Sequence, residues 1–167
     1  KEILIDEGDF TVSGGQFDHN NGTVRITIGT LGAWNLTGNV TFYNLSFDGG
    51  SSGRQYAINS DIFVLNELRI PSTHSNSTLF ISGGSLPRTI TLYGDLIHAG
   101  HSKFSDDFTL RMLGTTEQTI SEIGTGYLCS LQVSNTSDKV VLDGDVQMKG
   151  GLTIDSGAEL DVSVNDY

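Results

Sequence analysis

The chain of 167 residues carries a formal net charge of −11 and only nine Lys and Arg, which argues against nucleic acid as a partner because phosphates are neutralised by basic side chains. Its hydrophobic content of 37% is too high for a disordered chain, and the sequence lacks the long apolar run that insertion into a membrane needs. The 21 Gly and two Pro indicate many tight turns.

Strand signals recur along the whole chain, and helix signals are nearly absent. Apolar and polar residues alternate at a period of two in short runs that are rich in β-branched residues and end in Gly, Asn, Asp or Ser. We expect strands around residues 24–28, 45–47, 62–64, 79–81, 90–92, 110–112, 131–133 and 160–162. The sequence therefore predicts an all-β fold.

The apolar pattern repeats at long range. Residues 24–47 overlay residues 110–133 without a gap at an offset of 86 residues, and residues 62–70 resemble residues 146–154 at an offset of 84. Hydrophobic character is kept while identity is mostly lost, as in repeat proteins that conserve shape. We therefore predict one continuous solenoid over residues 1–167 that contains nearly two repeats of about 86 residues, approximately 1–86 and 87–167.

A motif of a small residue, Asp and a hydrophobic residue suggests a finer period. It occurs at Asp9, Asp61, Asp95 and Asp145, with spacings of 52, 34 and 50 residues. These spacings are near multiples of about 17 residues, which predicts roughly nine to ten short coils. Coils joined by turns and stacked about 4.8 Å apart form a parallel β-helix, or β-solenoid.

Tandem β-sandwiches of the immunoglobulin type are the alternative fold, because such a domain has about 100 residues and seven strands. A period near 17 residues has no role in a sandwich. The chain also lacks the buried Trp and Cys pattern of immunoglobulin domains. The parallel β-helix is therefore the preferred prediction.

Three segments carry a resemblance to known proteins: FDHNNGTVRI, VTFYNLSFDG and GDVQMKGGLTIDSGAELDVS. They resemble the tandem repeats of large secreted surface proteins of bacteria and archaea. Those repeats are generally interpreted as right-handed β-solenoids of adhesins and extracellular fibres. The resemblance implies this fold and habitat, and it implies no catalytic residues.

The four Asp of the short motif, Asp9, Asp61, Asp95 and Asp145, are predicted to form turns. Asp tolerates left-handed backbone geometry and accepts hydrogen bonds from nearby backbone N–H groups. Calcium is the alternative role, with Asp6, Asp9, Asp143 and Asp145 as candidate ligands, because this cation binds six to eight oxygens. No complete calcium-loop signature is present, so we predict no cofactor and keep calcium as the alternative.

Two further candidates for chemistry have a structural explanation. His98 and His101, followed by Asp106 and Asp107, have a spacing compatible with metal ligands, but a metal site needs more converging groups than these. Cys129 shares one strand face with apolar residues, so we expect a buried structural thiol.

Arginine and aromatic residues are the candidates for a polysaccharide site. The five Arg, at positions 25, 54, 69, 88 and 111, show no clustering with acidic residues in the sequence, so we predict no enzyme and no catalytic residue. The aromatic candidates for a sugar-binding face are Trp34, Phe42, Tyr43, Tyr56 and Tyr127. The 86-residue offset aligns Trp34 with Ile120 and Tyr43 with Cys129, so we interpret the aromatic residues as core.

Six Asn-x-Ser/Thr sequons indicate the compartment. They lie at Asn21, Asn35, Asn39, Asn44, Asn76 and Asn135, which is more than the Asn, Ser and Thr content gives by chance. Such sequons are acceptors for N-linked glycans in secreted proteins. We therefore expect an extracellular or cell-surface protein, and a glycoprotein.

These observations predict an extracellular structural protein: a segment or subunit of a surface filament, sheath or adhesin stalk. Its expected partners are copies of itself in a homopolymer, or neighbouring repeats of the same protein, because the chain begins and ends in strand patterns that suggest open coil edges. A carbohydrate- or surface-binding adhesin module, with a surface polysaccharide as partner, is the alternative. An enzyme of the β-helix type that acts on polysaccharide is the third hypothesis.

Overall fold

The computed structural model describes residues 1–27, 33–48, 54–70, 79–82, 87–100, 103–105, 107–124 and 126–163. These residues contain strands and no helix, so the all-β prediction is confirmed. No helix in this part of the chain is long and apolar enough to cross a membrane. The strands are β1 (Glu2–Asp6), β2 (Phe10–Thr11), β3 (Thr23–Thr27), β4 (Ala33–Thr37), β5 (Val40–Asp48), β6 (Arg54–Ile58), β7 (Ile62–Ile70), β8 (Leu79–Ser82), β9 (Arg88–Leu92), β10 (Asp95–Gly100), β11 (Lys103–Phe104), β12 (Phe108–Met112), β13 (Gln118–Gly124), β14 (Ser130–Val133), β15 (Lys139–Asp143), β16 (Leu152–Ile154) and β17 (Glu159–Asp161).

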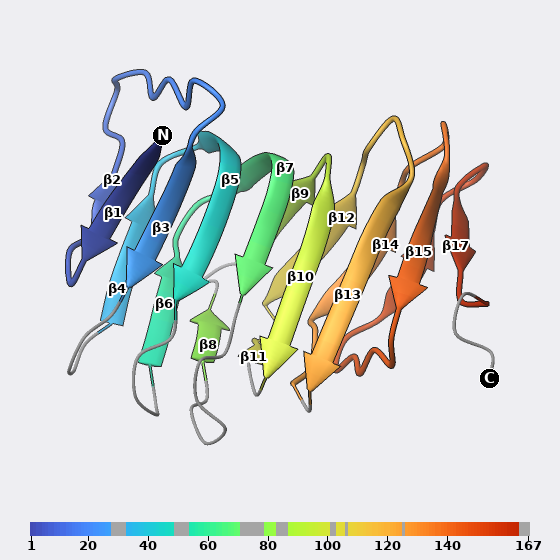
Figure 1. The fold of residues 1–167 in the computed structure, drawn as a ribbon. Coiled ribbons are helices and arrows are strands. Elements are labelled where there is room, and N and C mark those ends of the chain that lie inside the picture. The colour runs from blue at the N-terminus through green and yellow to red at the C-terminus, as the bar shows by residue number, and fades with distance from the viewer. Residues whose placement is uncertain are drawn as a thin grey trace.

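The strands wind into a stack of three-sided coils (Figure 1). The first face holds β1, β3, the second half of β5, the second half of β7, β10, β13, β15 and β17. The second face holds the first halves of β5 and β7, followed by β9, β12, β14 and β16. The third face holds β2, β4, β6, β8 and β11, and single bridges continue it to Tyr127 and Met148.

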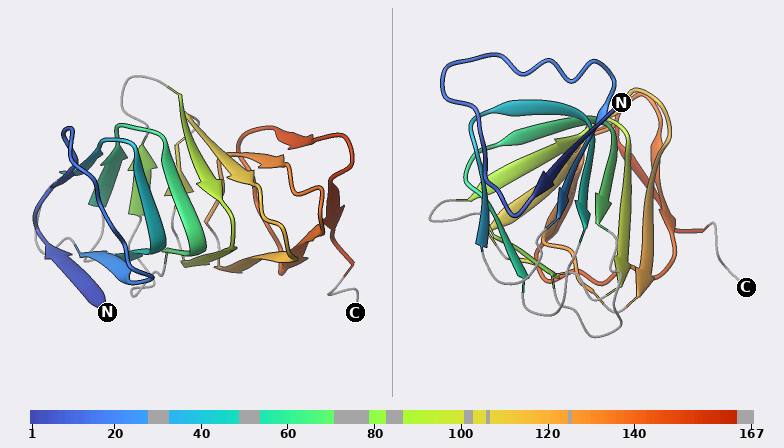
Figure 2. Two further views of the ribbon diagram at one scale, coloured as in Figure 1. Left: turned by 90° about the horizontal axis from the view of Figure 1, so that it is seen from above. Right: turned by 60° about the vertical axis from the view of Figure 1, so that its left-hand side comes forward.

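This arrangement is a parallel β-helix, as predicted, and it excludes the sandwich alternative. Every pairing among the described strands is parallel, whereas an immunoglobulin-like sandwich is built from antiparallel sheets. Seen close to the axis of the stack, the coils lie one behind another, and the segment between β2 and β3 projects beyond them (Figure 2). The molecule is therefore a short rod with its coils stacked from the N-terminal to the C-terminal end.

The predicted coil length and coil number are wrong. On the first face, Ile3 pairs with Val24 and Leu68 with Leu96, so one coil takes from about 20 to 28 residues rather than 17. The second face has six strand levels, which corresponds to about six turns instead of nine to ten.

The reason lies in where the short Asp motif occurs. Asp9 precedes a third-face strand, Asp61 precedes a second-face strand, and Asp95 begins a first-face strand. The spacings between these residues therefore mix whole coils with single faces. The offset of 86 residues behaves in the same way, because it relates Val24 on the first face to Leu110 on the second. The 86-residue offset therefore aligns residues of similar type that lie on different faces of the coil.

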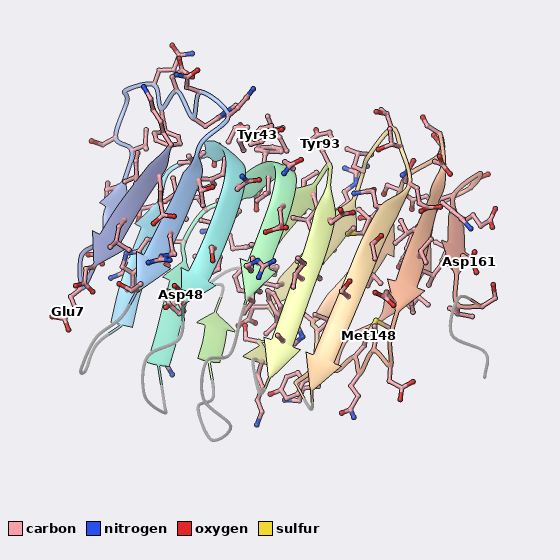
Figure 3. The ribbon with its side chains drawn as sticks, in the orientation of Figure 1. Glu7, Tyr43, Asp48, Tyr93, Met148 and Asp161 are labelled. Atoms are coloured by element: carbon pink, nitrogen blue, oxygen red, sulfur yellow. The ribbon has the colours of Figure 1, made fainter. Side chains whose placement is uncertain are left out.

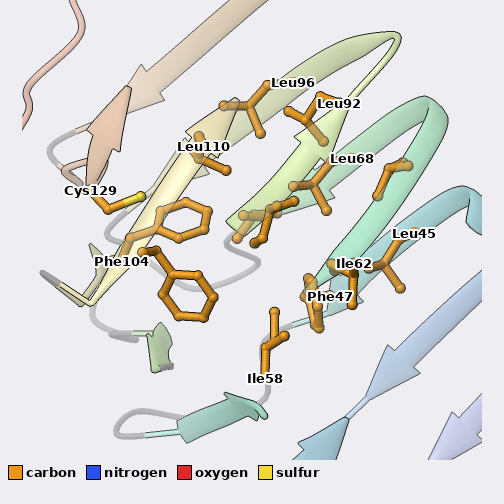
Figure 4. Close-up of a cluster of buried hydrophobic side chains, with 14 of the residues drawn as sticks. Leu45, Phe47, Ile58, Ile62, Leu68, Leu92, Leu96, Phe104, Leu110 and Cys129 are labelled. Carbon is orange, nitrogen blue, oxygen red and sulfur yellow. The ribbon is translucent and has the colours of Figure 1, made fainter. Parts of the chain in front are cut away.

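The core is a set of apolar columns inside the coils (Figure 4). Alternation at period two places every second strand residue inside, and the parallel register stacks each on its counterpart one coil away. One column contains Val24, Leu45, Leu68, Leu96 and Ile120, which are all buried. The apolar surface that these columns remove from water is the main stabilising contribution to the fold.

Candidate functional site: a charged groove beside an aromatic corner

Three of the four predicted turn residues make the same contact between coils. The Oδ1 atoms of Asp9, Asp61 and Asp95 accept the backbone N–H groups of Asn35, Thr89 and Thr119, each at 2.8 Å. Each carboxylate thus accepts a hydrogen bond from the next coil, and the three contacts lie on three different faces. Asp145 is exposed, and residues one coil after it lie outside the described part of the chain. The described contacts of the motif are therefore links between coils.

The calcium candidates are not brought together. Asp6 accepts the hydroxyl of Thr27 at 2.8 Å in the first coil, whereas Asp143 lies near Ser121 towards the other end of the stack. Among the described residues, no group of three or more His, Cys, Asp or Glu side chains could hold a metal ion.

The other candidates for chemistry are separated: they lie in the core, at the exposed Asp107 or outside the described residues. His98 is fully buried, and its ring lies 5.7 Å from that of Phe104. His101 and Asp106 lie outside the described residues. Cys129 is fully buried, which confirms the prediction of a buried thiol.

The sequons differ in accessibility. Asn21 and Asn39 are exposed, and Asn35 and Asn44 are half-buried. Asn135 is fully buried, and its Nδ2 donates to the Thr116 carbonyl oxygen at 2.7 Å. Asn76 lies outside the described residues. A glycan therefore fits Asn21 and Asn39 without rearrangement of the fold, whereas attachment at Asn135 requires local unfolding.

The aromatic residues divide into core and surface. Trp34, Phe42 and Tyr56 are at most 2% exposed, as predicted. The interpretation of Tyr43 as core is wrong, because this residue lies half-exposed where β5 turns from the second face to the first. Its assumed equivalent, Cys129, belongs to another part of the coil, so the 86-residue offset was misleading here.

Tyr43 is one of a row of side chains that we call the aromatic corner, comprising His19, Tyr43, Leu65 and Tyr93. The register of β5, β7 and β9 places the last three one coil apart at the same corner, and Leu65 and Tyr93 are each 36% exposed. The His19 ring stacks on Tyr43 at 5.8 Å. Tyr43 and Tyr93 lie along one edge of the rod (Figure 3).

The corner is tight because the backbone of neighbouring coils approaches closely there. A Cβ atom on Gly94 would collide with the carbonyl oxygen of Asn66. Glycine is therefore required beside Tyr93, and the tyrosine ring points away from the stack.

A groove of about 380 Å³ lies on the first face next to this corner. We call it the charged groove, and its charged residues are Glu2, Arg25, Asp48, Glu67 and Arg69. Arg25 Nε lies 3.3 Å from Asp48 Oδ2 and 3.6 Å from Glu2 Oε1, and Arg69 Nε lies 3.1 Å from Glu67 Oε1.

The structure therefore brings arginines and acids together where the sequence shows no clustering. Residues separated by one coil become neighbours on a face, so Arg25 is followed in register by Ser46 and then by Arg69. The missed signal is a spacing of about 21 to 23 residues between outward-facing positions of the predicted strands.

Thr23 and Asn44 are neutral polar residues of the groove lining, and Asn66 lies beside them. Asn66 Nδ2 donates to Asn44 Oδ1 at 2.8 Å, and Asn44 Nδ2 donates to Thr23 Oγ1 at 3.2 Å, so three coils are linked. Ser46 is only 7% exposed between the two arginines, and its hydroxyl has no partner among the described residues.

Two carboxylates of the last coils, those of Asp155 and Asp161, are held by neighbouring side chains. Ser134 Oγ donates to Asp155 at 2.6 Å and Gln132 Nε2 donates at 3.0 Å, and these hydrogen bonds lower the pKa of Asp155. Lys139 Nζ lies 2.7 Å from Asp161 Oδ2. This hydrogen-bonded ion pair lowers the pKa of Asp161 and raises the pKa of Lys139.

The interpretation of Tyr127 as core is also wrong, because this residue is only half-buried and lies on the third face. The Lys103 and Lys149 ammonium groups lie 5.6 and 5.1 Å from the centre of the Tyr127 ring, within the range of cation–π attraction. Tyr127 is therefore engaged by cations from the coils before and after it, unlike the tyrosines of the aromatic corner.

Comparison of the chain with protein-family models, curated proteins and solved structures finds no match. The class of the protein is accordingly defined by its fold, a parallel β-helix of about six turns.

Proposed function

We propose that this chain is a structural segment of an extracellular rod, in which its end coils stack on coils of the same kind. The observation that carries the proposal is the exposure of core columns at both ends. Ile3 is 49% exposed although its register partner Val24 is 3% exposed. At the other end, Leu152 is 46% exposed and its partner Leu131 is 2% exposed.

One more coil at either end would cover these side chains. Burial of the exposed half of a residue such as Ile3 or Leu152 contributes about 1 kcal/mol, and the outer backbone groups of an edge strand are ready to pair with another strand. A second copy of this chain, or a neighbouring repeat of the same protein, has coils of the right shape for both contacts.

The two ends are different surfaces, with β1 at one and β16 and β17 at the other. Contact between unlike surfaces of identical subunits is heterologous, and it gives open filaments unless a ring closes. This geometry suits a filament, sheath or stalk. No catalytic activity is part of the proposal.

The extracellular location rests on two supports. The chain has more sequons than expected by chance, and two of their asparagines, Asn21 and Asn39, are exposed. In addition, the NGTV and TFYNL-type segments resemble repeats of secreted surface proteins. The cell surface is therefore the compartment in which we expect the rod.

Two substitutions at opposite ends test the stacking. We expect Ile3→Asp and Leu152→Asp each to abolish concentration-dependent assembly, because each places a carboxylate in a joint that must become dry. A mixture of the two proteins should give one-to-one dimers and nothing larger, since each retains one intact end. Sedimentation velocity measures both results.

Leu4→Asp is the matched control. Leu4 is in the same strand and 52% exposed, but its register partner Arg25 points outward from the first face, so this variant should assemble normally. Larger assemblies of Ile3→Asp alone, or absence of dimers in the mixture, would contradict end-to-end stacking.

A carbohydrate-binding role is the second candidate function. The aromatic corner beside the charged groove favours it, and the two roles are compatible because the groove lies on a side of the rod and the joints lie at its ends.

A further inference from the structure

We propose that the aromatic corner and the charged groove form one binding site for a neutral polysaccharide that lies along the axis of the rod. All the groups that form this site belong to one chain and to its side surface. The site therefore does not depend on end-to-end stacking, and either proposal can fail without the other.

The two tyrosines of the aromatic corner, half-buried Tyr43 and exposed Tyr93, are spaced as a sugar chain requires. Tyr43 and Tyr93 occupy the same corner two coils apart, which at about 4.8 Å per coil places them roughly 10 Å apart along the axis. That distance is comparable to the length of a disaccharide in an extended chain. The C–H groups of a sugar ring carry partial positive charge and pack against the negative face of an aromatic ring, so alternate sugars can rest on the two tyrosines.

Hydrogen-bonding groups lie beside the rings. The ion pairs of Arg25 and Arg69 run through Nε, so the terminal guanidinium nitrogens remain as donors. The amides of Asn44 and Asn66 each have more donors and acceptors than their contacts within the protein use. Sugar hydroxyls both donate and accept, and they match such a mixed surface.

Ser46 adds a hydroxyl to these polar groups. This side chain is more than nine-tenths buried at the floor of the groove between the two arginines. Because the Ser46 hydroxyl makes no hydrogen bond to another described residue, it can donate to, and accept from, a hydroxyl of a bound sugar.

The charges select a neutral ligand. The two arginines of the groove face three carboxylates, those of Glu2, Asp48 and Glu67, and the whole chain carries a net charge of −11. A polysaccharide of uronic acids or sulfated sugars would be repelled by this field. A neutral chain avoids the repulsion, and the carboxylates can accept hydrogen bonds from its hydroxyls.

Isothermal titration calorimetry on the full chain tests the proposal. The probes are the neutral hexasaccharides cellohexaose, xylohexaose and mannohexaose, with polygalacturonate as the anionic comparison. We expect at least one neutral probe to bind with a millimolar or lower dissociation constant, and polygalacturonate to bind more weakly than that probe. Tyr43→Ala and Tyr93→Ala should each weaken binding roughly tenfold, as removal of a stacking ring does at other sites.

Two further variants separate loss of binding from loss of structure. Tyr127→Ala removes a half-buried tyrosine from the third face and should leave the affinity unchanged. Arg69→Met keeps much of the side-chain volume and should weaken binding without a change in the urea midpoint. Failure of every neutral probe to bind, stronger binding of polygalacturonate, or full affinity in both corner variants would overturn the proposal.

Discussion

The two halves of the rod have the same coil architecture, but they differ in the side chains that fill the interior and cover the surface. From β1 to β7 the interior contains two clusters of three rings, Phe10 with Phe17 and Phe42, and Trp34 with Phe47 and Tyr56. From β12 to β17 the interior is mainly aliphatic, and it also holds the buried amides of Gln118 and Asn135. Gln118 receives the Gly114 N–H and donates to the carbonyl oxygens of Leu92 and Gly94.

The surfaces of the two halves differ as well. In the first half, the arginines and amides of the groove retain free donors. In the last coils, Asp155 and Asp161 are held by neighbouring side chains from the adjacent coil. One architecture can therefore use its polar residues in two ways: the C-terminal coils use them to hold coils together, and the N-terminal coils leave them for a ligand.

The largest expected effect is in the aromatic interior. Phe47 is fully buried, with its ring 4.9 Å from Tyr56 and 6.1 Å from Trp34. Phe47→Ala should lower the free energy of unfolding by about 3–5 kcal/mol, as measured by urea denaturation, because it leaves a large cavity. Val133→Ala, at a fully buried position of the second half, removes fewer atoms and should cost less. If Val133→Ala lowered the free energy of unfolding as much as Phe47→Ala or more, the aromatic interior of the first half would not be the more stabilising one.

The next effect concerns the buried amide of the second half. Gln118→Leu leaves two carbonyl oxygens and the Gly114 N–H without their partner, and it removes one acceptor from Asn135 Nδ2. It should therefore cost about 1–3 kcal/mol in the same urea experiment. Gln147→Leu is the matched control, since Gln147 is exposed and its substitution should change stability by no more than about 0.5 kcal/mol. If Gln118→Leu left the free energy of unfolding unchanged, water or a movement of the backbone would have to replace the hydrogen bonds of the amide.

A smaller effect is expected at the Asp links between coils. Asp61→Ala removes an acceptor from the N–H of Thr89 and should cost about 1 kcal/mol. Asp145→Ala alters the same motif where the described residues show no contact with a following coil, and it should cost less. Thermal unfolding of the two variants compares them, and equal losses would show that the motif acts through its own turn and not through the next coil.

The smallest effect should appear as a dependence on pH in the last coils. The pKa values of Asp155 and Asp161 are lowered in the folded protein, so their contribution is present above the unfolded pKa of about 4 and is lost as the pH falls through the folded values. Lys139 has the opposite sign, because its pKa is raised, and its contribution is lost as the pH rises beyond the usual value for lysine.

Hydrogen exchange measured at neutral and acidic pH tests this behaviour. We expect β14 to β17 to lose protection before β3 to β7 as the pH is lowered. In the double variant Asp155→Asn and Asp161→Asn the exchange of β14 to β17 should change less with pH than in the unaltered protein. Simultaneous loss of protection along the whole rod would contradict a local origin.

Sequence reasoning predicted the strands and the parallel β-helix because alternation at period two depends only on which side chains face inward. It failed on the coil length, since Asp9, Asp61 and Asp95 mark different faces of coils that vary in length. For the same reason it missed the contact between Arg25 and Asp48, which lie 23 residues apart in sequence and 3.3 Å apart in space. It also placed Tyr43 in the core, because an offset that crosses faces aligned it with a buried cysteine.

The most direct test of end-to-end stacking is electron microscopy of the protein in its native preparation, together with its mass in solution. We expect filaments whose axial repeat is the height of one chain, roughly 30–40 Å for six to eight coil levels at about 4.8 Å each. Discrete monomers at high concentration, without filaments, would contradict the proposal that the open ends of the rod are joints.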